Sequence, residues 1–176
     1  YQQRALTALT HVFADVVLDD SSAMEANPVF DVADRQITDN IADLQAGLVQ
    51  GVEAIPRPWR TRTDDGVLGV DVKMETGTGK TLVYTQVMYE LNRLYGFHKF
   101  ILLVPSTPIK EGTRSFITSG YARRYFDDEY GSRLKLDLEV LDLQKRSKGR
   151  KMFPSAIASF VQASRLAKGH ITALLD

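Results

Sequence analysis

The chain of 176 residues is long enough to bury the core of one domain, and its 44% hydrophobic and 25% charged residues are ordinary for a globular protein. Its 22 Lys and Arg balance its 22 Asp and Glu, which excludes a global attractive field and limits any nucleic-acid site to a local patch. The absence of cysteine excludes disulfides and cysteine zinc sites and favours a reducing, cytoplasmic compartment, and no apolar run approaches the ~20 residues of a membrane helix.

The first 66 residues are predicted to be mainly helical. Apolar residues recur at helical spacing over Tyr1–Leu18 and over Asp34–Val49, and an irregular linker with Arg57, Arg60 and Arg62 follows. Gln2 is a candidate adenine-binding residue, because its amide can donate to and accept from the edge of a base at once. The alternative is an ordinary surface glutamine at a helix start.

The middle of the chain has the pattern of a phosphate-binding loop. A valine-rich segment, Val67–Lys73, is predicted to be a buried strand, and a helix is predicted over Gly79–Tyr95. Between them lies Met74–Thr81, METGTGKT, whose order of strand, glycine loop, Gly-Lys-Thr and helix is that of a P-loop. The general motif has a glycine where this chain has Met74. The alternative is a glycine turn with a solvated lysine.

Each residue of the loop has an expected task. Gly77 and Gly79 let main-chain N–H groups approach a ligand closely, and the helix dipole adds positive potential. Lys80 is placed to reach the outer phosphates, and Thr81 offers a hydroxyl to Mg²⁺. Thr76 and Thr78 belong to the same anion-binding loop and are also candidate cofactor-binding residues.

A second strand, Lys99–Val104, follows the loop helix, so a βαβ unit and a parallel sheet are expected. The loop after this strand lies on the ligand-binding edge of such a sheet. There Thr107 is expected to cap the next helix, and Ser106, Thr107 and Lys110 are candidates for contact with a nucleic-acid phosphate. An ordinary capped turn is an equal alternative.

The remaining elements are predicted from periodicity. We expect helices over Ile109–Phe126 and Pro154–Leu166, a solvated loop at Asp127–Tyr130, and strands over Leu134–Leu143 and His170–Leu175. A basic run, Lys145–Lys151, either follows a DNA backbone or is a solvated loop. A strand that ends in Asp176 suggests a magnesium-orienting acid, but its small residues and the lack of a following Glu argue against that role.

The segments VDVKMETGTGKTLVYTQVMYEL and KFILLVPSTPIKEG, with the opening Tyr-Gln, resemble the N-terminal motor region of the Res subunit of type III restriction endonucleases, which are superfamily II helicase-like ATPases. The resemblance is sharp over Asp71–Phe116. It implies an α/β, RecA-like P-loop domain with three layers and a mostly parallel sheet, incomplete at the C-terminus. Residues 1–66 would form a helical lead-in and residues 67–176 the first part of motor domain 1.

The resemblance also implies roles for particular residues. Gln2 matches the adenine-reading glutamine, Met74–Thr81 match the motif that binds ATP and Mg²⁺, and Pro105–Lys110 match a motif that contacts DNA. Lys80 and Thr81 would then be catalytic. The implied partners are double-stranded DNA and a methyltransferase (modification) subunit.

Several parts of a complete motor are not recognised in the sequence. We find no clear Asp-Glu motif, second RecA-like domain or nuclease, so the chain is expected to be a piece of a longer enzyme that binds ATP weakly and does not hydrolyse it alone. Two alternatives stay open. One is another superfamily II helicase or a type I restriction motor, and the other is a P-loop kinase of small molecules, for which an arginine-rich lid is missing.

Overall fold

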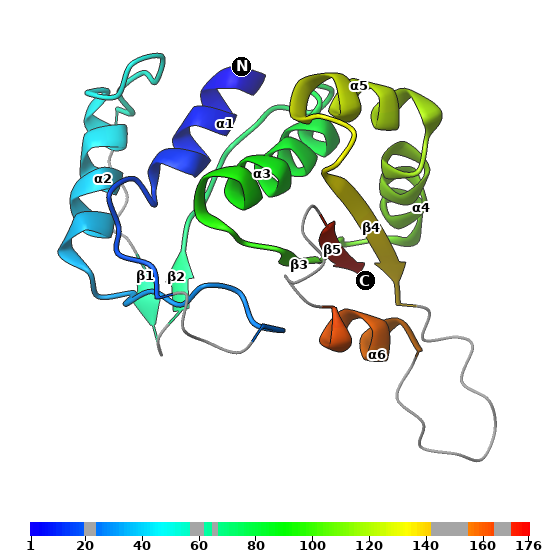
Figure 1. Cartoon of the computed structure of the whole chain (residues 1–176). Helices are drawn as coiled ribbons and strands as arrows, with labels where there is room; N and C mark the ends of the chain where they lie inside the picture. The colour runs from blue at the N-terminus through cyan, green and yellow to red at the C-terminus, as the bar shows by residue number, and fades with distance from the viewer. Residues whose placement is uncertain (20–23, 57–61, 65–66, 142–154, 164–169) are drawn as a thin grey trace. The chain divides into compact units, whose positions relative to one another are not determined.

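A computed structural model describes residues 1–19, 24–56, 62–64, 67–141, 155–163 and 170–176 (Figure 1). The chain forms two compact units. Unit 1 comprises residues 1–21 and 28–95, and unit 2 comprises residues 22–27 and 96–176. The division expected at residue 66 lies within unit 1 and stays a prediction about domain organisation.

Unit 1 is built around three helices, α1 (Gln2–His11), α2 (Arg35–Ala46) and α3 (Lys80–Tyr95). Both α2 and α3 pack against α1. The core between α2 and the segment after α1 consists of buried aliphatic side chains at helical spacing: Val12, Val16, Ile37, Ile41 and Leu44. The apolar pattern predicted for the second helix is therefore confirmed up to Leu44, whereas Leu48 lies beyond the helix and is exposed.

Capping residues set the ends of α2. The side chain of Asp34 accepts a hydrogen bond from the backbone N–H of Gln36 at 2.9 Å. At the other end Gly47 has a φ of 72°, which suits glycine. The buried Asn40 donates to Val12 O and Ala14 O at 3.1 and 2.7 Å and so satisfies two carbonyl groups after α1.

The strand before the phosphate loop differs from its prediction. Only β2 (Val67–Gly69) is a strand, and it pairs antiparallel with β1 (Arg62–Asp64). Val67, Val70 and Val72 are exposed, so the expectation of a buried strand over Val67–Lys73 is wrong. The expected βαβ unit through α3 is also not found among the described residues. The prediction failed because a valine-rich composition indicates strand propensity but not which strand is the pairing partner.

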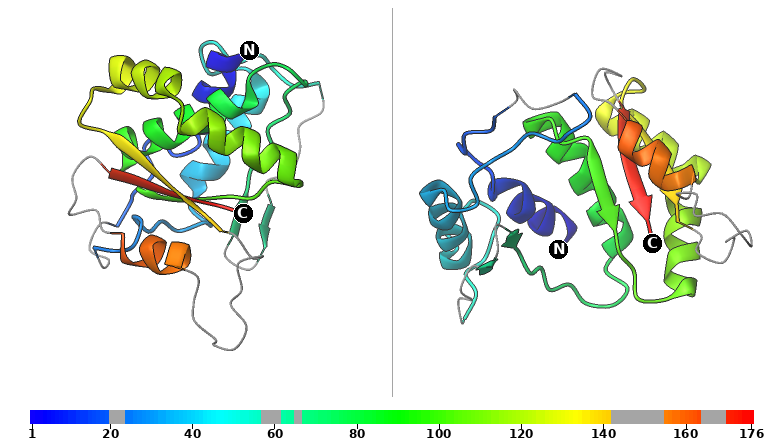
Figure 2. Two further views of the ribbon diagram at one scale, coloured as in Figure 1. Left: turned by 90° about the vertical axis from the view of Figure 1, so that its right-hand side faces the viewer. Right: turned by 90° about the horizontal axis from the view of Figure 1, so that it is seen from below.

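Unit 2 is an α/β structure with a parallel sheet, as expected. Its strands are β3 (Lys99–Leu102), β4 (Lys135–Val140) and β5 (His170–Leu175), in the order β3-β5-β4. The central strand β5 is buried from Ile171 onward, which explains its nearly continuous apolar sequence. Helix α6 (Ser155–Gln162) lies on one side of this sheet and α4 (Thr107–Ile117) and α5 (Gly120–Tyr130) on the other (Figures 1 and 2).

The long helix predicted over Ile109–Phe126 is in fact two helices. Helix α4 ends at Ile117, and Ser119 caps α5 by accepting from the N–H of Ala122 at 3.1 Å. The acidic segment Asp127–Tyr130, expected in a loop, forms the last turn of α5. The break was not predicted because apolar residues continue at helical spacing across Thr118 and Ser119.

Two basic segments considered in the sequence fall wholly or partly outside the described residues. They are Lys145–Lys151 and the linker arginines Arg57 and Arg60. Among the described residues, no helix has the length and apolar content needed to cross a membrane.

Candidate nucleotide-binding site

The loop Met74–Thr81 forms a glycine turn that leads directly into α3. Gly77 and Gly79 both have a φ of 82°, a region that L side chains rarely adopt. Between them the hydroxyl of Thr78 donates to Glu75 O at 2.7 Å and closes the turn. These backbone angles favour glycine at both positions, and the close approach of main-chain N–H groups to a ligand stays a prediction.

Helix α3 begins immediately after the second glycine, where Val83 N donates to Gly79 O at 3.1 Å. The first N–H groups of a helix lack partners within the helix, and the helix dipole makes this end positive. The structure thus places the N-terminus of a 16-residue helix directly after the glycine turn. Such an end attracts anions, above all phosphate.

Lys80 and Thr81 occupy the first turn of α3. Lys80 is exposed and makes no ion pair within the described part of the chain, so its ammonium is accessible to an anion. Thr81 is partly buried, and its carbonyl accepts from the hydroxyl of Thr85 at 2.7 Å. Within the described part of the chain the side-chain hydroxyl of Thr81 makes no hydrogen bond, which suits a ligand for a cation. Thr76, on the outer part of the loop, is exposed.

Gln2 lies beside this loop although it is distant in sequence. Its side-chain amide donates to Thr78 O at 3.0 Å. A Cβ atom added to Gly79 would lie 2.3 Å from Gln2 Nε2, so the glutamine closely approaches the loop backbone. The packing of α1 against α3 brings these two segments of unit 1 together.

A cavity of about 420 Å³ lies between the start of the chain and the loop. It is lined by Tyr1, Gln2, Gln3, Gly77 and Thr78. Tyr1 and Gln3 were not singled out as site residues by their pattern. Tyr1 is exposed, and the guanidinium of Arg4 lies 5.8 Å from its ring centre. The sequence signal that could have identified Tyr1 is an aromatic residue next to the candidate adenine-binding Gln2.

The second group of predicted residues belongs to unit 2. Ser106 precedes α4 with extended backbone angles, its side chain makes no capping hydrogen bond, and Pro108 lies in the first turn. The helix begins at Thr107 and Ser106 is at the N-cap position, so the prediction that Thr107 caps the helix is wrong by one residue. Ser106 and Thr107 are exposed beside the helix N-terminus.

Lys110 is directed to the ends of two strands. Its ammonium donates to Leu141 O and lies 3.5 Å from a carboxylate oxygen of Asp176. The side chain of Lys110 is only 19% exposed. The lysine expected to contact DNA therefore already has an anionic partner and a carbonyl partner within unit 2.

A magnesium ion needs more ligands than the loop alone offers. Within the described part of the chain, no three His, Asp or Glu side chains are grouped as metal ligands. The hydroxyl of Thr81 can supply one oxygen, and the phosphates of a bound nucleotide would supply others. The donor set therefore fits a metal that arrives with its nucleotide.

The chain matches known proteins over most of its length. Residues 1–168 match the family described as "Type III restriction enzyme, res subunit". The StyLTI Res subunit of Salmonella typhimurium LT2 is 50% identical over 118 residues, which cover 66% of this chain and 12% of that protein. The Res subunits of EcoPI from Escherichia phage P1 and of EcoP15I from Escherichia coli are each 33% identical over 99% of this chain and 18% of theirs.

These relatives are all named as Res subunits of type III restriction-modification enzymes. The chain spans only 12% to 18% of their length, so the agreement concerns one part of such a subunit. The family match, in contrast, includes α1, the glycine loop and α4 together. The chain belongs to the family of type III restriction enzyme Res subunits.

Proposed function

We propose that this chain is the ATP-binding part of a DNA-translocating, helicase-like Res subunit. The observation that carries the proposal is the join between the glycine turn and α3, with Lys80 exposed in the first helical turn. A turn of this kind offers main-chain N–H groups, a helix dipole and a cation to the same anion. Family membership supports the reading of this anion as the triphosphate of ATP.

Within the proposed site each side chain has one task. Main-chain N–H groups from Gly77 to Thr81 bind the phosphate oxygens, and Lys80 neutralises charge that develops on the outer phosphates. The hydroxyl of Thr81 ligates Mg²⁺, which supplies further charge neutralisation when bound with the nucleotide. Gln2 binds the edge of adenine from the neighbouring cavity, where Tyr1 offers an aromatic surface.

The parent enzyme would couple ATP hydrolysis to movement along double-stranded DNA and then cleave the DNA. Ser106 and Thr107, exposed at the start of α4, are proposed to contact DNA phosphates. A modification subunit is the proposed protein partner, which accords with the names of the relatives as restriction-modification enzymes. We propose that the chain by itself binds ATP without hydrolysing it, because phosphoryl transfer also needs a metal-ordering acid and a positioned water.

The decisive experiment measures nucleotide binding by the chain with a fluorescent ATP analogue and Mg²⁺. Lys80→Ala is expected to weaken binding about 10- to 150-fold, since a hydrogen bond to a charged group contributes about 1.5 to 3 kcal/mol. Lys73→Ala is the matched control, because Lys73 is an exposed lysine that lies before the glycine turn. Equal effects of the two substitutions, or ATP hydrolysis by the chain that Lys80→Ala abolishes, would contradict the corresponding part of the proposal.

A DNA-stimulated ATPase assay on the whole parent enzyme tests the larger assignment. Stimulation by double-stranded DNA is expected for a translocase. ATP hydrolysis that does not respond to DNA would instead indicate a small-molecule kinase or another ATPase and would refute the motor assignment.

A further inference from the structure

The first turn of α1 carries Gln2, and its geometry limits what the side-chain amide of this residue can recognise. The amide lies 3.0 Å from Thr78 O. Because a carbonyl oxygen only accepts hydrogen bonds, the amide nitrogen must face it. The amide oxygen and one N–H of Gln2 are then left for a ligand. This acceptor and donor match the 6-amino group and N7 of adenine, whereas a purine with an oxygen at the 6-position presents two acceptors.

Recognition by such an amide depends on how the start of α1 is held, because hydrogen bonds weaken steeply when their angles change. Local groups do little to fix this turn. Helix α1 has no acidic residue in its first turn, and Tyr1 at the N-cap position makes no side-chain hydrogen bond to the helix. An acidic residue or a capping side chain commonly stabilises the start of a helix. The position of Gln2 therefore depends on contacts with distant segments of unit 1.

Arg4 makes such a contact from the same helical turn. Its guanidinium lies 2.7 Å from a carboxylate oxygen of Glu53, which is 49 positions away in the sequence. The guanidinium also lies 5.8 Å from the ring centre of Tyr1. The side chains of Arg4 and Glu53 are 40% and 76% exposed, so the ion pair is at the surface. It joins the turn that carries Gln2 to the segment that follows α2.

The segment that carries Glu53 is itself anchored to unit 1. The chain turns back after α2, where Ile55 N donates to Gln45 O at 3.0 Å. Val52, which precedes Glu53, packs against the buried aliphatic core beside α2. An anchored loop thus presents the carboxylate of Glu53 to α1.

A direct contact between Arg4 and the nucleotide is the alternative role. Arg4 is not among the residues that line the cavity beside the glycine loop. Its charge already has a partner in Glu53, whereas Lys80 is exposed in the first turn of α3 and makes no ion pair within the described part of the chain. These observations favour an indirect role for Arg4.

We propose that Arg4 and Glu53 are positioning residues of the proposed adenine site. Their ion pair holds the first turn of α1 so that Gln2 keeps its amide nitrogen on Thr78 O and offers its amide oxygen to the 6-amino group of the base. The pair therefore contributes to the preference for adenine over a 6-oxo purine without contacting the nucleotide. This inference rests on the proposed function, because it requires a nucleotide in the cavity.

The ratio of the affinities for ATP and ITP, measured with the full chain and Mg²⁺, tests the inference. ITP has an oxygen in place of the 6-amino group, and its sugar and phosphates are those of ATP. The unchanged chain is expected to bind ATP about tenfold more tightly than ITP, and Gln2→Ala to bind the two about equally. Glu53→Gln and Arg4→Met should each lower the ratio about two- to fivefold, which is the upper range for an exposed ion pair.

Two controls separate positioning from general stability. Arg35→Met removes the exposed ion pair between Arg35 and Asp39 on α2, whose charged atoms lie 3.6 Å apart, and should leave the ratio unchanged. The exchanged pair, Arg4→Glu with Glu53→Arg, should restore the ratio to within about twofold, whereas each charge reversal alone lowers it. A loss of folded protein would reduce the apparent binding of ATP and ITP by the same factor and would not change their ratio.

The outcomes distinguish this inference from the proposed function. If Glu53→Gln and Arg4→Met left the ratio unchanged while Lys80→Ala still weakened ATP binding, the inference would be overturned and the nucleotide site would stand. Equal affinities of the unchanged chain for ATP and ITP would have the same meaning. Weaker binding of both nucleotides by Arg4→Met, but not by Glu53→Gln, would overturn the inference by assigning Arg4 to the phosphates. If the unchanged chain bound neither nucleotide, the proposed function would fail together with the inference.

Discussion

The contact between Gln2 and the glycine loop leads to a prediction that uses two similar glycines. Gly77 and Gly79 share a φ of 82°, so alanine is strained at either position. A Cβ at Gly77 meets nothing within 4 Å, whereas one at Gly79 would lie 2.3 Å from Gln2 Nε2. Gly77→Ala therefore measures backbone strain alone, and Gly79→Ala measures strain together with displacement of the glutamine.

The expected magnitudes follow from these two terms. Left-handed backbone costs an L residue about 1 to 2 kcal/mol, of which about 0.4 to 1 kcal/mol is offset by the smaller entropy of the unfolded chain. We expect Gly77→Ala to lower the free energy of unfolding by about 1 kcal/mol. Gly79→Ala should cost about 0.5 to 1 kcal/mol more, because the hydrogen bond from Gln2 to Thr78 O is lost.

A double-mutant cycle isolates the contribution of the glutamine. Urea unfolding followed by circular dichroism is measured for the unchanged chain, Gly79→Ala, Gln2→Ala and the double variant. In the Gln2→Ala background, Gly79→Ala should cost no more than Gly77→Ala does, since the displaced side chain is already absent. The same variants can be tested for nucleotide affinity, where both glycine substitutions should weaken phosphate binding.

One result would refute this reasoning. If Gly79→Ala and Gly77→Ala cost the same in the unchanged chain, and Gln2→Ala did not alter either cost, Gln2 would not contact the loop in solution. The placement of Gln2 beside the proposed adenine site would then have to be abandoned, although the glycine turn itself would be unaffected.

Two further predictions concern paired groups outside the loop. Lys110→Met should lower the free energy of unfolding by about 1 to 3 kcal/mol, because Leu141 O and Asp176 lose their partner. If the substitution instead reduced the slope of log affinity against log salt concentration by about one, measured for DNA binding by the parent enzyme, Lys110 would be assigned to the DNA backbone. Burial, and secondarily a nearby carboxylate, raise the pKa of Tyr95 above its ordinary 10.0, while its hydroxyl donates to Thr10 O at 2.8 Å. The folded state then retains a proton that the unfolded state releases, so stability should fall as pH rises from about 10 to the higher folded pKa, and Tyr95→Phe should remove this part of the decline in urea titrations.

Most helices of the described chain could be predicted from the sequence because their signals are local. Apolar spacing and capping residues are properties of neighbouring positions, so α2 and α3 were placed within three residues of their observed ends. The helix predicted over Tyr1–Leu18, in contrast, ends at His11. The same holds for the glycine turn, whose unusual backbone angles require glycine whatever surrounds it. The break at Ser119 was missed because apolar residues continued across it at helical spacing.

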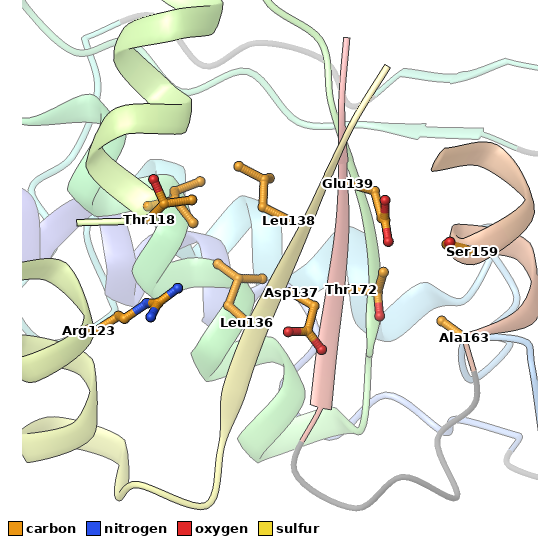
Figure 3. A pocket seen from close by; sticks show the side chains of 10 residues that line it. Thr118, Arg123, Leu136, Asp137, Leu138, Glu139, Ser159, Ala163 and Thr172 are labelled. Atoms are coloured by element: carbon orange, nitrogen blue, oxygen red, sulfur yellow. The ribbon is translucent and has the colours of Figure 1, made fainter. Parts of the chain in front are cut away.

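Pairing between distant segments was predictable only in part. The parallel sheet of unit 2 was expected, but β2 was assigned to the wrong kind of pairing. A valine-rich run satisfies the propensity of a strand in any sheet, and its partner depends on long-range packing. The cavity of about 480 Å³ that β4 lines also needs α4, α5, α6 and β5 to be in place (Figure 3). No pattern within the sequence of β4 predicts these neighbours.

For this protein, local sequence was sufficient to determine the glycine turn, the exposed lysine after it and most helix positions, since each depends on backbone angles and the spacing of neighbouring side chains. Only the tertiary structure decided that Gln2 contacts Thr78, that Lys110 faces the ends of β4 and β5, and that β5 lies between β3 and β4 in the sheet. The physical reason is that these contacts join residues 31 to 76 positions apart, and their geometry arises from the packing of whole elements.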